Sequence, residues 1–212
     1  MGKKKALVID DEKIVIDSVK KSLEEKYDVE ATLSGKQGLG WAIQKDYDVV
    51  LTDIRMPDIG GMLVLRDIKR VKPMLPVMMI TGYASVNSAV QAMKLGAADY
   101  IEKPFMPDDL IKAVDLAIEK SAFRPPDEQA LVHKEEILRV LERAATDGEF
   151  VHQLLHRWAD ALDEYHLTGP EKLALLTGDI EWIEKHTGPL TEKQKRWLQR
   201  PISPEVLKVF GW

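Results

Sequence analysis

The sequence predicts an α/β fold, a doubly wound five-stranded parallel sheet, followed by a small all-α domain. Three observations lead to this prediction. Five short apolar runs, mostly rich in β-branched residues, recur in the first half of the chain, as in strands buried on both faces of a parallel sheet. Stretches with helical periodicity separate these runs, which is typical of doubly wound sheets. After the proline pair Pro125 and Pro126, only helical patterns remain.

The first half of the chain alternates between predicted strands and predicted helices. The strand runs are ALVID, VEAT, VVLTD, PVMMIT and YIEK, at 6–10, 29–32, 49–53, 76–81 and 100–103. The helical stretches cover about 13–26, 35–45, 62–72, 85–95 and 107–120. Ser34 and Ser85 are predicted to cap the helices that they open, and Gly96 is predicted to follow the end of a helix.

Five polar residues stand where successive predicted strands end. They are three carboxylates, a hydroxyl and an ammonium: Asp10, Asp11, Asp53, Thr81 and Lys103. Because the C-terminal ends of parallel strands meet at one edge of a sheet, we expect these side chains to form one site. The carboxylates suit a hard cation such as Mg²⁺, and a lysine and a hydroxyl suit an incoming phosphoryl group. The sequence therefore predicts a site that places a phosphate on a carboxylate.

Four motifs within residues 4–121 resemble those of one protein family. They are VIDDE at 8–12, LTDIRMPDIGGM at 51–62, MITGYAS at 79–85 and DYIEKPF at 99–105. In this order and spacing they resemble the receiver domain of two-component response regulators, which has a CheY-like, flavodoxin-type fold. The tract from Thr81 to Phe105 is most similar to receivers of the NtrC type.

The resemblance implies a phosphoacceptor and a metal site. Asp53 corresponds to the aspartate that accepts a phosphoryl group from a sensor histidine kinase. Asp10 and Asp11 correspond to the acidic pair that binds Mg²⁺, or Mn²⁺, together with Asp53. The backbone carbonyl of Arg55 corresponds to a further metal ligand. The resemblance implies no turnover of an external substrate, so we expect a signalling protein and not an enzyme.

The same resemblance implies a switch. Lys103 corresponds to the lysine that pairs with the phosphoryl oxygens, and the Lys103–Pro104 peptide bond is expected to be cis. Thr81 corresponds to the switch hydroxyl, and Tyr100 to the aromatic residue that changes rotamer with it. Added charge at Asp53 would alter the surface formed by the last helix, strand and helix of the receiver, where a homodimer partner could bind.

The composition limits the location and the partners that we expect. The 212 residues carry a net charge of −5, which gives no bulk attraction to nucleic acid or to a membrane. There are no cysteines, so disulfides and thiolate metal sites are excluded. No apolar run approaches transmembrane length and no signal peptide opens the chain, so we expect a cytoplasmic protein without a membrane partner.

The segment 123–126 is the predicted linker between a receiver domain at 1–122 and a helical domain at 127–212. Helical patterns in the second domain cover 127–146, 149–165, 170–177, 179–186 and 191–200, and Ser203 is predicted to cap a final turn. The stretch 149–165 has an apolar stripe with a period of 3.6, formed by Val151, Leu154, Leu155, Trp158, Leu162 and Tyr165. Capping boxes are predicted for Thr168 with Glu171 and for Thr191 with Gln194.

Several function classes remain open for the helical domain. After residue 121 there are 12 Lys and Arg against 16 Asp and Glu, a balance of −4 that disfavours nucleic acid. The basic segment 191–200 is the best candidate for a DNA-contacting helix, and a solvated amphipathic helix is the alternative. His152 and His156 lie one helical turn apart and could share a metal, but no third ligand is evident. His133 is a candidate for phosphotransfer, although its neighbours do not resemble the usual motif.

Residues 162–188 are similar in rhythm to the small helical subunit of extradiol ring-opening dioxygenases, the LigA-like fold. In that family the small subunit packs against a catalytic partner, so the resemblance implies a protein-interaction module. The sequence thus predicts a response regulator that signals to an unknown downstream protein through its helical domain. A transcription regulator whose C-terminal domain binds DNA or RNA is the alternative. A phosphorelay intermediate without an output of its own is the third hypothesis.

Overall fold

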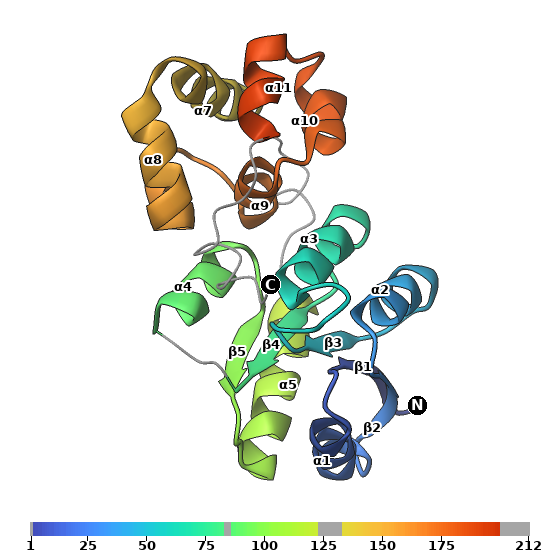
Figure 1. Cartoon of the computed structure of the whole chain (residues 1–212). Coiled ribbons are helices and arrows are strands. Elements are labelled where there is room, and N and C mark those ends of the chain that lie inside the picture. The colour runs from blue at the N-terminus through green and yellow to red at the C-terminus, as the bar shows by residue number, and fades with distance from the viewer. Residues whose placement is uncertain (1, 83–85, 123–132, 200–212) are drawn as a thin grey trace. The chain divides into compact units, whose positions relative to one another are not determined.

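The computed structural model describes residues 2–82, 86–122 and 133–199 (Figure 1). The described residues form two compact units, one within 2–122 and the other within 133–199. The predicted linker at 123–126, the Ser85 cap and the final turn from Ser203 lie outside the described residues.

The first unit contains a five-stranded sheet in the order β2-β1-β3-β4-β5. The strands are β1 at Lys4–Ile9, β2 at Tyr27–Thr32, β3 at Val49–Thr52, β4 at Val77–Thr81 and β5 at Asp99–Glu102. All four strand pairs are parallel, which confirms the predicted fold class. In the register of the sheet, Ile9 pairs with Thr32 on one side and with Thr52 on the other. The residues that follow β1 and β3 therefore emerge side by side at one edge.

Helices cover both faces of this sheet (Figure 1). They are α1 at Lys13–Leu23, α2 at Gly35–Gln44, α3 at Gly61–Val71, α4 at Val86–Lys94 and α5 at Pro107–Ala122. Val19 of α1 and Val114 of α5 are fully buried in one core cluster with Val8 and Leu51 of the sheet. On α2, Gly38 lies directly against Ile9. The apolar faces of the helices thus bury the strands from both sides, as the continuous apolar runs predict.

The predicted helix ends in the first unit are confirmed at the described positions. The Ser34 side chain accepts a hydrogen bond from the Gln37 backbone and caps α2. Gly96 has a φ of +95°, and the Ala97 amide donates to the carbonyl of Ala92, which is the Schellman geometry that ends α4. A glycine suits this position because L side chains rarely adopt positive φ.

The second unit is entirely helical in its described part. It contains α7 at Lys134–Thr146, α8 at Gly148–Arg157, a 3₁₀ helix η1 at Trp158–Leu162, α9 at Gly169–Thr177, α10 at Ile180–Thr187 and α11 at Glu192–Leu198. Its core is formed by side chains that include Ile137, Leu141, Phe150, Leu162 and Ile183, each of them fully buried. Both predicted capping boxes, at the starts of α9 and α11, are present.

The prediction of one continuous helix over 149–165 is wrong. The α-helix ends at Arg157, and Trp158 has a φ of +56°, which is uncommon for a bulky residue. A straight helix, rising 1.5 Å per residue, would carry Tyr165 about 12 Å along the axis beyond Arg157. The break instead turns the chain back, so that the Tyr165 ring lies 6.0 Å from the Phe150 ring and is buried. Hydrophobic periodicity alone does not detect such a break, because the apolar stripe continues through the residues on both sides of it.

Candidate functional site

Three of the predicted site residues meet at the C-terminal edge of the sheet. Asp10 directly follows β1, Asp53 directly follows β3, and Lys103 directly follows β5. The Lys103 Nζ lies 2.6 Å from Asp10 Oδ2 and 3.1 Å from Asp53 Oδ1. The exposed fractions of the three side chains are 2% for Asp10, 5% for Asp53 and 11% for Lys103. The site is therefore a nearly buried pair of carboxylates that share one ammonium.

Backbone hydrogen bonds orient both carboxylates. The Glu12 amide donates to Asp10 Oδ1 at 2.9 Å, and the Arg55 amide donates to Asp53 Oδ2 at 2.7 Å. Each bond closes a tight local loop that fixes the carboxylate just after its strand ends. The Asp53 amide in turn donates to the carbonyl of Ile9 at 2.9 Å, which links the two strand ends directly.

The site contains more acidic than basic groups. Burial raises the pKa of Asp10 and the pKa of Asp53 above the ordinary aspartate value, and the opposing effect of Lys103 is smaller. Burial also disfavours the charged form of Lys103, but the two carboxylates outweigh it and raise the pKa of that amine. Two acidic groups thus face one basic group, and a further cation would stabilise the ionised carboxylates.

One oxygen of Asp53 is buried without a hydrogen bond. Asp53 Oδ1 lies close enough to Lys103 Nζ to form an ion pair, but the two atoms do not have the geometry of a hydrogen bond. A buried, unsatisfied acceptor is costly, and a metal ligand bond would satisfy it. The donor set of carboxylate oxygens therefore fits Mg²⁺ or Mn²⁺. Within residues 2–82, 86–122 and 133–199, no three carboxylate or imidazole groups converge as a ready-made cage, so water would complete the coordination.

Of the remaining predicted residues, Asp11 and Thr81 lie at the same edge, whereas Tyr100 lies further back on β5. Asp11 is exposed, but its charge contributes to raising the pKa of Asp53. Thr81 is the last residue of β4 and is fully buried, and its carbonyl accepts a hydrogen bond from the Lys103 amide at 2.9 Å. Tyr100 lies within β5 and is half-buried. The predicted cis peptide bond between Lys103 and Pro104 is confirmed.

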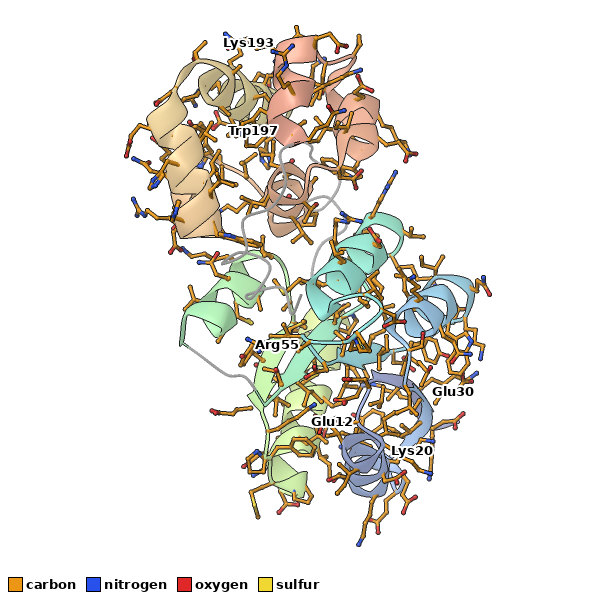
Figure 2. The ribbon with its side chains drawn as sticks, viewed as in Figure 1. Glu12, Lys20, Glu30, Arg55, Lys193 and Trp197 are labelled. Carbon is orange, nitrogen blue, oxygen red and sulfur yellow. The ribbon has the colours of Figure 1, made fainter. Side chains whose placement is uncertain are left out.

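Two residues of the site were not predicted. The Glu12 carboxylate lies 3.5 Å from Lys103 Nζ and is 60% exposed, so it extends the acidic rim of the site. Asp58, in the loop after β3, accepts three hydrogen bonds from the start of α2 and a fourth from the neighbouring Ile59 amide. Figure 2 labels Glu12 and Arg55, which belong to the loops that follow β1 and β3. The position of Glu12 after two aspartates is a usable signal, whereas the role of Asp58 depends on contacts between distant segments.

The comparison of this chain with known proteins agrees with the geometry of the site. The family model described as the response regulator receiver domain matches residues 6–115. The chain belongs to the response regulator receiver family. The match ends within α5, so it covers the sheet and the site but not the helical unit.

Curated relatives of the receiver include two named regulators. The transcriptional regulatory protein ZraR of Escherichia coli strain K12 is 39% identical over 92 residues, which are 43% of this chain and 21% of that protein. The cell cycle response regulator CtrA of Brucella abortus strain 2308 is 31% identical over 118 residues, which are 55% of this chain and 51% of that protein. The chain therefore spans about half, or less, of the length of these relatives.

Solved structures share the fold of the receiver. A receiver domain protein from Clostridium thermocellum is 37% identical with a TM-score of 0.53, and the match covers 56% of this chain and 97% of that one. The BeF3-activated DrrB receiver domain is 30% identical with a TM-score of 0.52, covering 56% of this chain and 99% of that one. NtrX from Brucella abortus, in complex with ADP, is 30% identical with a TM-score of 0.55, covering 68% of this chain and 35% of that one.

The histidines of the helical unit do not form a comparable site. The rings of His152 and His156 are exposed and stacked, with centroids 3.9 Å apart, and His156 Nδ1 lies 2.8 Å from the His152 carbonyl. His133 stands at the start of α7, where its backbone amide and ring Nδ1 both contact the buried carboxylate of Glu171. In the described part of the chain, neither position brings together three metal-ligating groups.

One basic side chain of helix α11 forms an ion pair with another helix of the same unit. Lys195 pairs with Glu184 of α10 at 2.9 Å, whereas Lys193 and Arg196 are exposed. Leu198 is buried and Trp197 packs against the core, as expected for an amphipathic helix; Figure 2 labels Trp197 and Lys193 on α11. No helix among the described residues is both long and apolar enough to span a membrane.

Proposed function

We propose that this chain is a two-component response regulator whose Asp53 accepts a phosphoryl group from a sensor histidine kinase. The observation that carries the proposal is the buried Asp53 carboxylate, with one unsatisfied oxygen, beside Asp10 and Lys103. The proposed metal ligands are Asp10, Asp11, Asp53 and the carbonyl of Arg55, with Mg²⁺ or Mn²⁺ as the ion. Similarity to a receiver that is described as BeF3-activated supports this assignment.

In the proposed reaction, an oxygen of Asp53 attacks the phosphorus of a phosphohistidine. The new O–P bond forms as the N–P bond to the imidazole breaks, and the imidazole leaves with the electron pair. The metal ion, when bound, neutralises the carboxylates and the phosphoryl oxygens. Lys103 is already held at the acceptor and can pair with a phosphoryl oxygen, while the Arg55 amide keeps Asp53 oriented. The protein itself then carries the product, so no external substrate is turned over.

The proposed switch couples this charge to the surface of α4, β5 and α5. Thr81 and Tyr100 are its proposed moving parts, since they lie on the two strands that lead to this surface. Large apolar side chains are exposed there, namely Val90 and Met93 on α4 and Leu116 on α5. Exposed apolar groups favour a protein contact, so we propose this surface for a homodimer or another protein partner.

The proposed output is a protein-interaction domain built from the helical unit, with a downstream protein as its partner. Its acidic balance of 12 basic against 16 acidic residues after residue 121 supports a protein partner over nucleic acid. The LigA-like resemblance of residues 162–188 supports the same kind of module. The proposed location is the cytoplasm, where a sensor kinase can reach the receiver.

A transcription regulator is the second candidate function. It is favoured by the names of two relatives, a transcriptional regulatory protein and a cell cycle response regulator. In this case the exposed Lys193 and Arg196 of α11 would face nucleic acid. A gel-shift assay on genomic fragments, with and without acetyl phosphate, separates this function from the protein-interaction module.

Phosphorylation of purified protein tests the main proposal. Incubation with acetyl phosphate and Mg²⁺ is expected to add one phosphoryl group, detected by intact-protein mass spectrometry. Asp53→Asn is expected to abolish it, because the amide cannot act as the acceptor. Asp11→Ala is expected to keep the fold, since Asp11 is exposed, and to require more Mg²⁺ for the same rate. Labelling that persists in Asp53→Asn would refute the assignment of the acceptor.

A further inference from the structure

Asp58 holds the loop between β3 and α3 against the first turn of α2. Its carboxylate accepts hydrogen bonds from Ser34 Oγ at 2.7 Å and from the amides of Gly35 at 3.1 Å and Lys36 at 3.0 Å. It also accepts a bond from the amide of Ile59 at 2.9 Å. These bonds hold the pKa of Asp58 low, at about 2, against the opposing effect of burial. The carboxylate therefore stays charged and bound to α2 throughout the neutral range.

The same loop is packed closely at other points. A Cβ on Gly35 would lie 2.5 Å from the Ile59 side chain and 2.7 Å from the Ile59 carbonyl, so the helix start touches the loop directly. At the far end, the Gly61 amide donates to the carbonyl of Ile54 at 2.9 Å. Between these points, Ile54 and Met56 are buried. The loop from residue 54 to residue 60 is thus anchored along its length.

Apolar burial and hydrogen bonding supply different parts of this anchoring. Burial of Ile54 and Met56 is non-directional and holds the loop near the core without fixing the rotation of its peptide groups. The bonds of Asp58 are directional, and the acceptor is a full charge at a helix N-terminus, where the helix dipole favours an anion. The bond from the Gly61 amide to the Ile54 carbonyl is also directional, so Asp58 acts together with that bond in limiting how the peptide groups of this loop can turn.

The peptide groups in question belong to the candidate site. The Arg55 amide donates to Asp53 Oδ2, and the carbonyl of Arg55 is the proposed metal ligand. Residues that orient metal ligands by hydrogen bonding typically change metal affinity by about 10–100-fold when mutated. We infer that Asp58 is a positioning residue for the phosphoacceptor site, which it serves by fixing the loop that carries Arg55 to the N-terminus of α2. The inference rests on the proposed function and adds to it a residue outside the metal and phosphoryl contacts.

The test compares Asp58→Asn with Asp115→Asn in the full chain. Asp115, on α5, is a matched control, because its carboxylate likewise accepts hydrogen bonds and likewise has a lowered pKa. The donors to Asp115 are the side chains of Lys26 and Tyr27, which lie outside the loop that carries Arg55. The first readout is hydrogen exchange at the Arg55 amide in metal-free protein. The second is the Mg²⁺ concentration needed for half-maximal phosphorylation by acetyl phosphate, measured together with the maximal rate.

Asp58→Asn is expected to accelerate exchange at Arg55 and to raise the half-maximal Mg²⁺ concentration by about ten-fold. The maximal rate at saturating Mg²⁺ should change less, because bound metal re-orders the loop. Ser34→Ala removes one of the four donors to Asp58 and should give a smaller shift in the same direction. Asp115→Asn should leave both readouts at the wild-type level, whatever it does to thermal stability.

If Asp58→Asn matches the wild type both in exchange at the Arg55 amide and in its Mg²⁺ requirement, the inference is overturned. Asp58 is then only a structural helix cap. Failure of the proposed function would look different, because the wild type itself would then take no phosphoryl group from acetyl phosphate. In that case the exchange readout still decides whether Asp58 positions the Arg55 peptide group.

Discussion

At the scale of single residues, the main feature is one ammonium shared by two nearly buried carboxylates. Lys103 lies between Asp10 and Asp53, where a divalent cation would also be attracted. Burial raises the pKa of both carboxylates, so their ionised forms depend on the positive charge that is near them. A metal ion bound as proposed would therefore compete with the ammonium for the same oxygens.

The first prediction concerns Lys103→Met. Removing one partner of a buried ion pair leaves an uncompensated charge, so the metal-free variant should lose about 3 kcal/mol of stability in urea unfolding. Added Mg²⁺ should restore much of this loss and should stabilise the variant more than the wild type, because the ion no longer competes with the ammonium. An equal gain from Mg²⁺ in both proteins would show that Lys103 and the cation do not share these oxygens.

The second prediction concerns the acid stability that Asp58 supplies. Its pKa in the folded state, about 2, is lower than the value of about 3.9 for an unfolded aspartate, so the group stabilises the fold above pH ~4. This contribution, at most about 2 kcal/mol after allowance for solvent screening, is lost as the pH falls through 2. Urea unfolding between pH 5 and 2 should therefore be less pH-dependent in Asp58→Asn than in the wild type. Asp10 and Asp53, whose pKa values are raised, act in the opposite direction in both proteins.

Among the elements, α3 approaches the site closely because it begins with a glycine, and a second glycine, in α2, offers a contrast. Gly61 opens α3, and a Cβ there would lie 2.0 Å from the backbone carbonyl of Asp53. Gly40 lies inside α2 with no atom within 4 Å of an added Cβ. The same substitution therefore has opposite expected effects at the two positions.

The third prediction compares Gly61→Ala with Gly40→Ala. Gly61→Ala should cost about 1–3 kcal/mol, because the backbone must move to relieve the overlap, and the movement displaces Asp53. Gly40→Ala should gain about 0.5–1 kcal/mol, because alanine is the better helix former. Thermal unfolding and the rate of phosphorylation by acetyl phosphate measure both effects. A neutral Gly61→Ala with a normal rate would contradict the close packing of α3 on the acceptor.

At the scale of the whole molecule, two units each have a core of their own. In the described part of the helical unit, Trp158 is buried, and Trp182 and Trp197 pack against the core. The large apolar side chains that are exposed within residues 2–82, 86–122 and 133–199 all lie in the receiver. The described part of the helical unit, residues 133–199, thus exposes no large apolar side chain.

The fourth prediction is that residues 122–212, expressed alone, fold as a helical unit and bind no DNA in a salt-dependent way. The fold should persist because the buried side chains of this unit contact one another, and circular dichroism with thermal unfolding tests this. DNA binding should be absent because acidic residues outnumber basic ones after residue 121, 16 to 12. Sub-micromolar DNA binding that weakens steeply with added salt would overturn the protein-interaction proposal and favour a transcription regulator.

Sequence patterns were enough to predict the alternation of strands and helices, the order of the site residues and most caps. The strands and the caps are local, since apolar runs set the strands, and Ser34 and the capping boxes set helix starts. The meeting of Asp10, Asp53 and Lys103 is not local, but it follows from the general rule that parallel strands end at one edge of a sheet. The break at Trp158 and the three bonds between Asp58 and the start of α2 became known from the structure alone. Both features depend on contacts between segments that are distant in sequence, and neither hydrophobic periodicity nor motif spacing reports such contacts. The break buries Tyr165 against Phe150, and the Asp58 carboxylate meets a helix that begins more than twenty residues earlier.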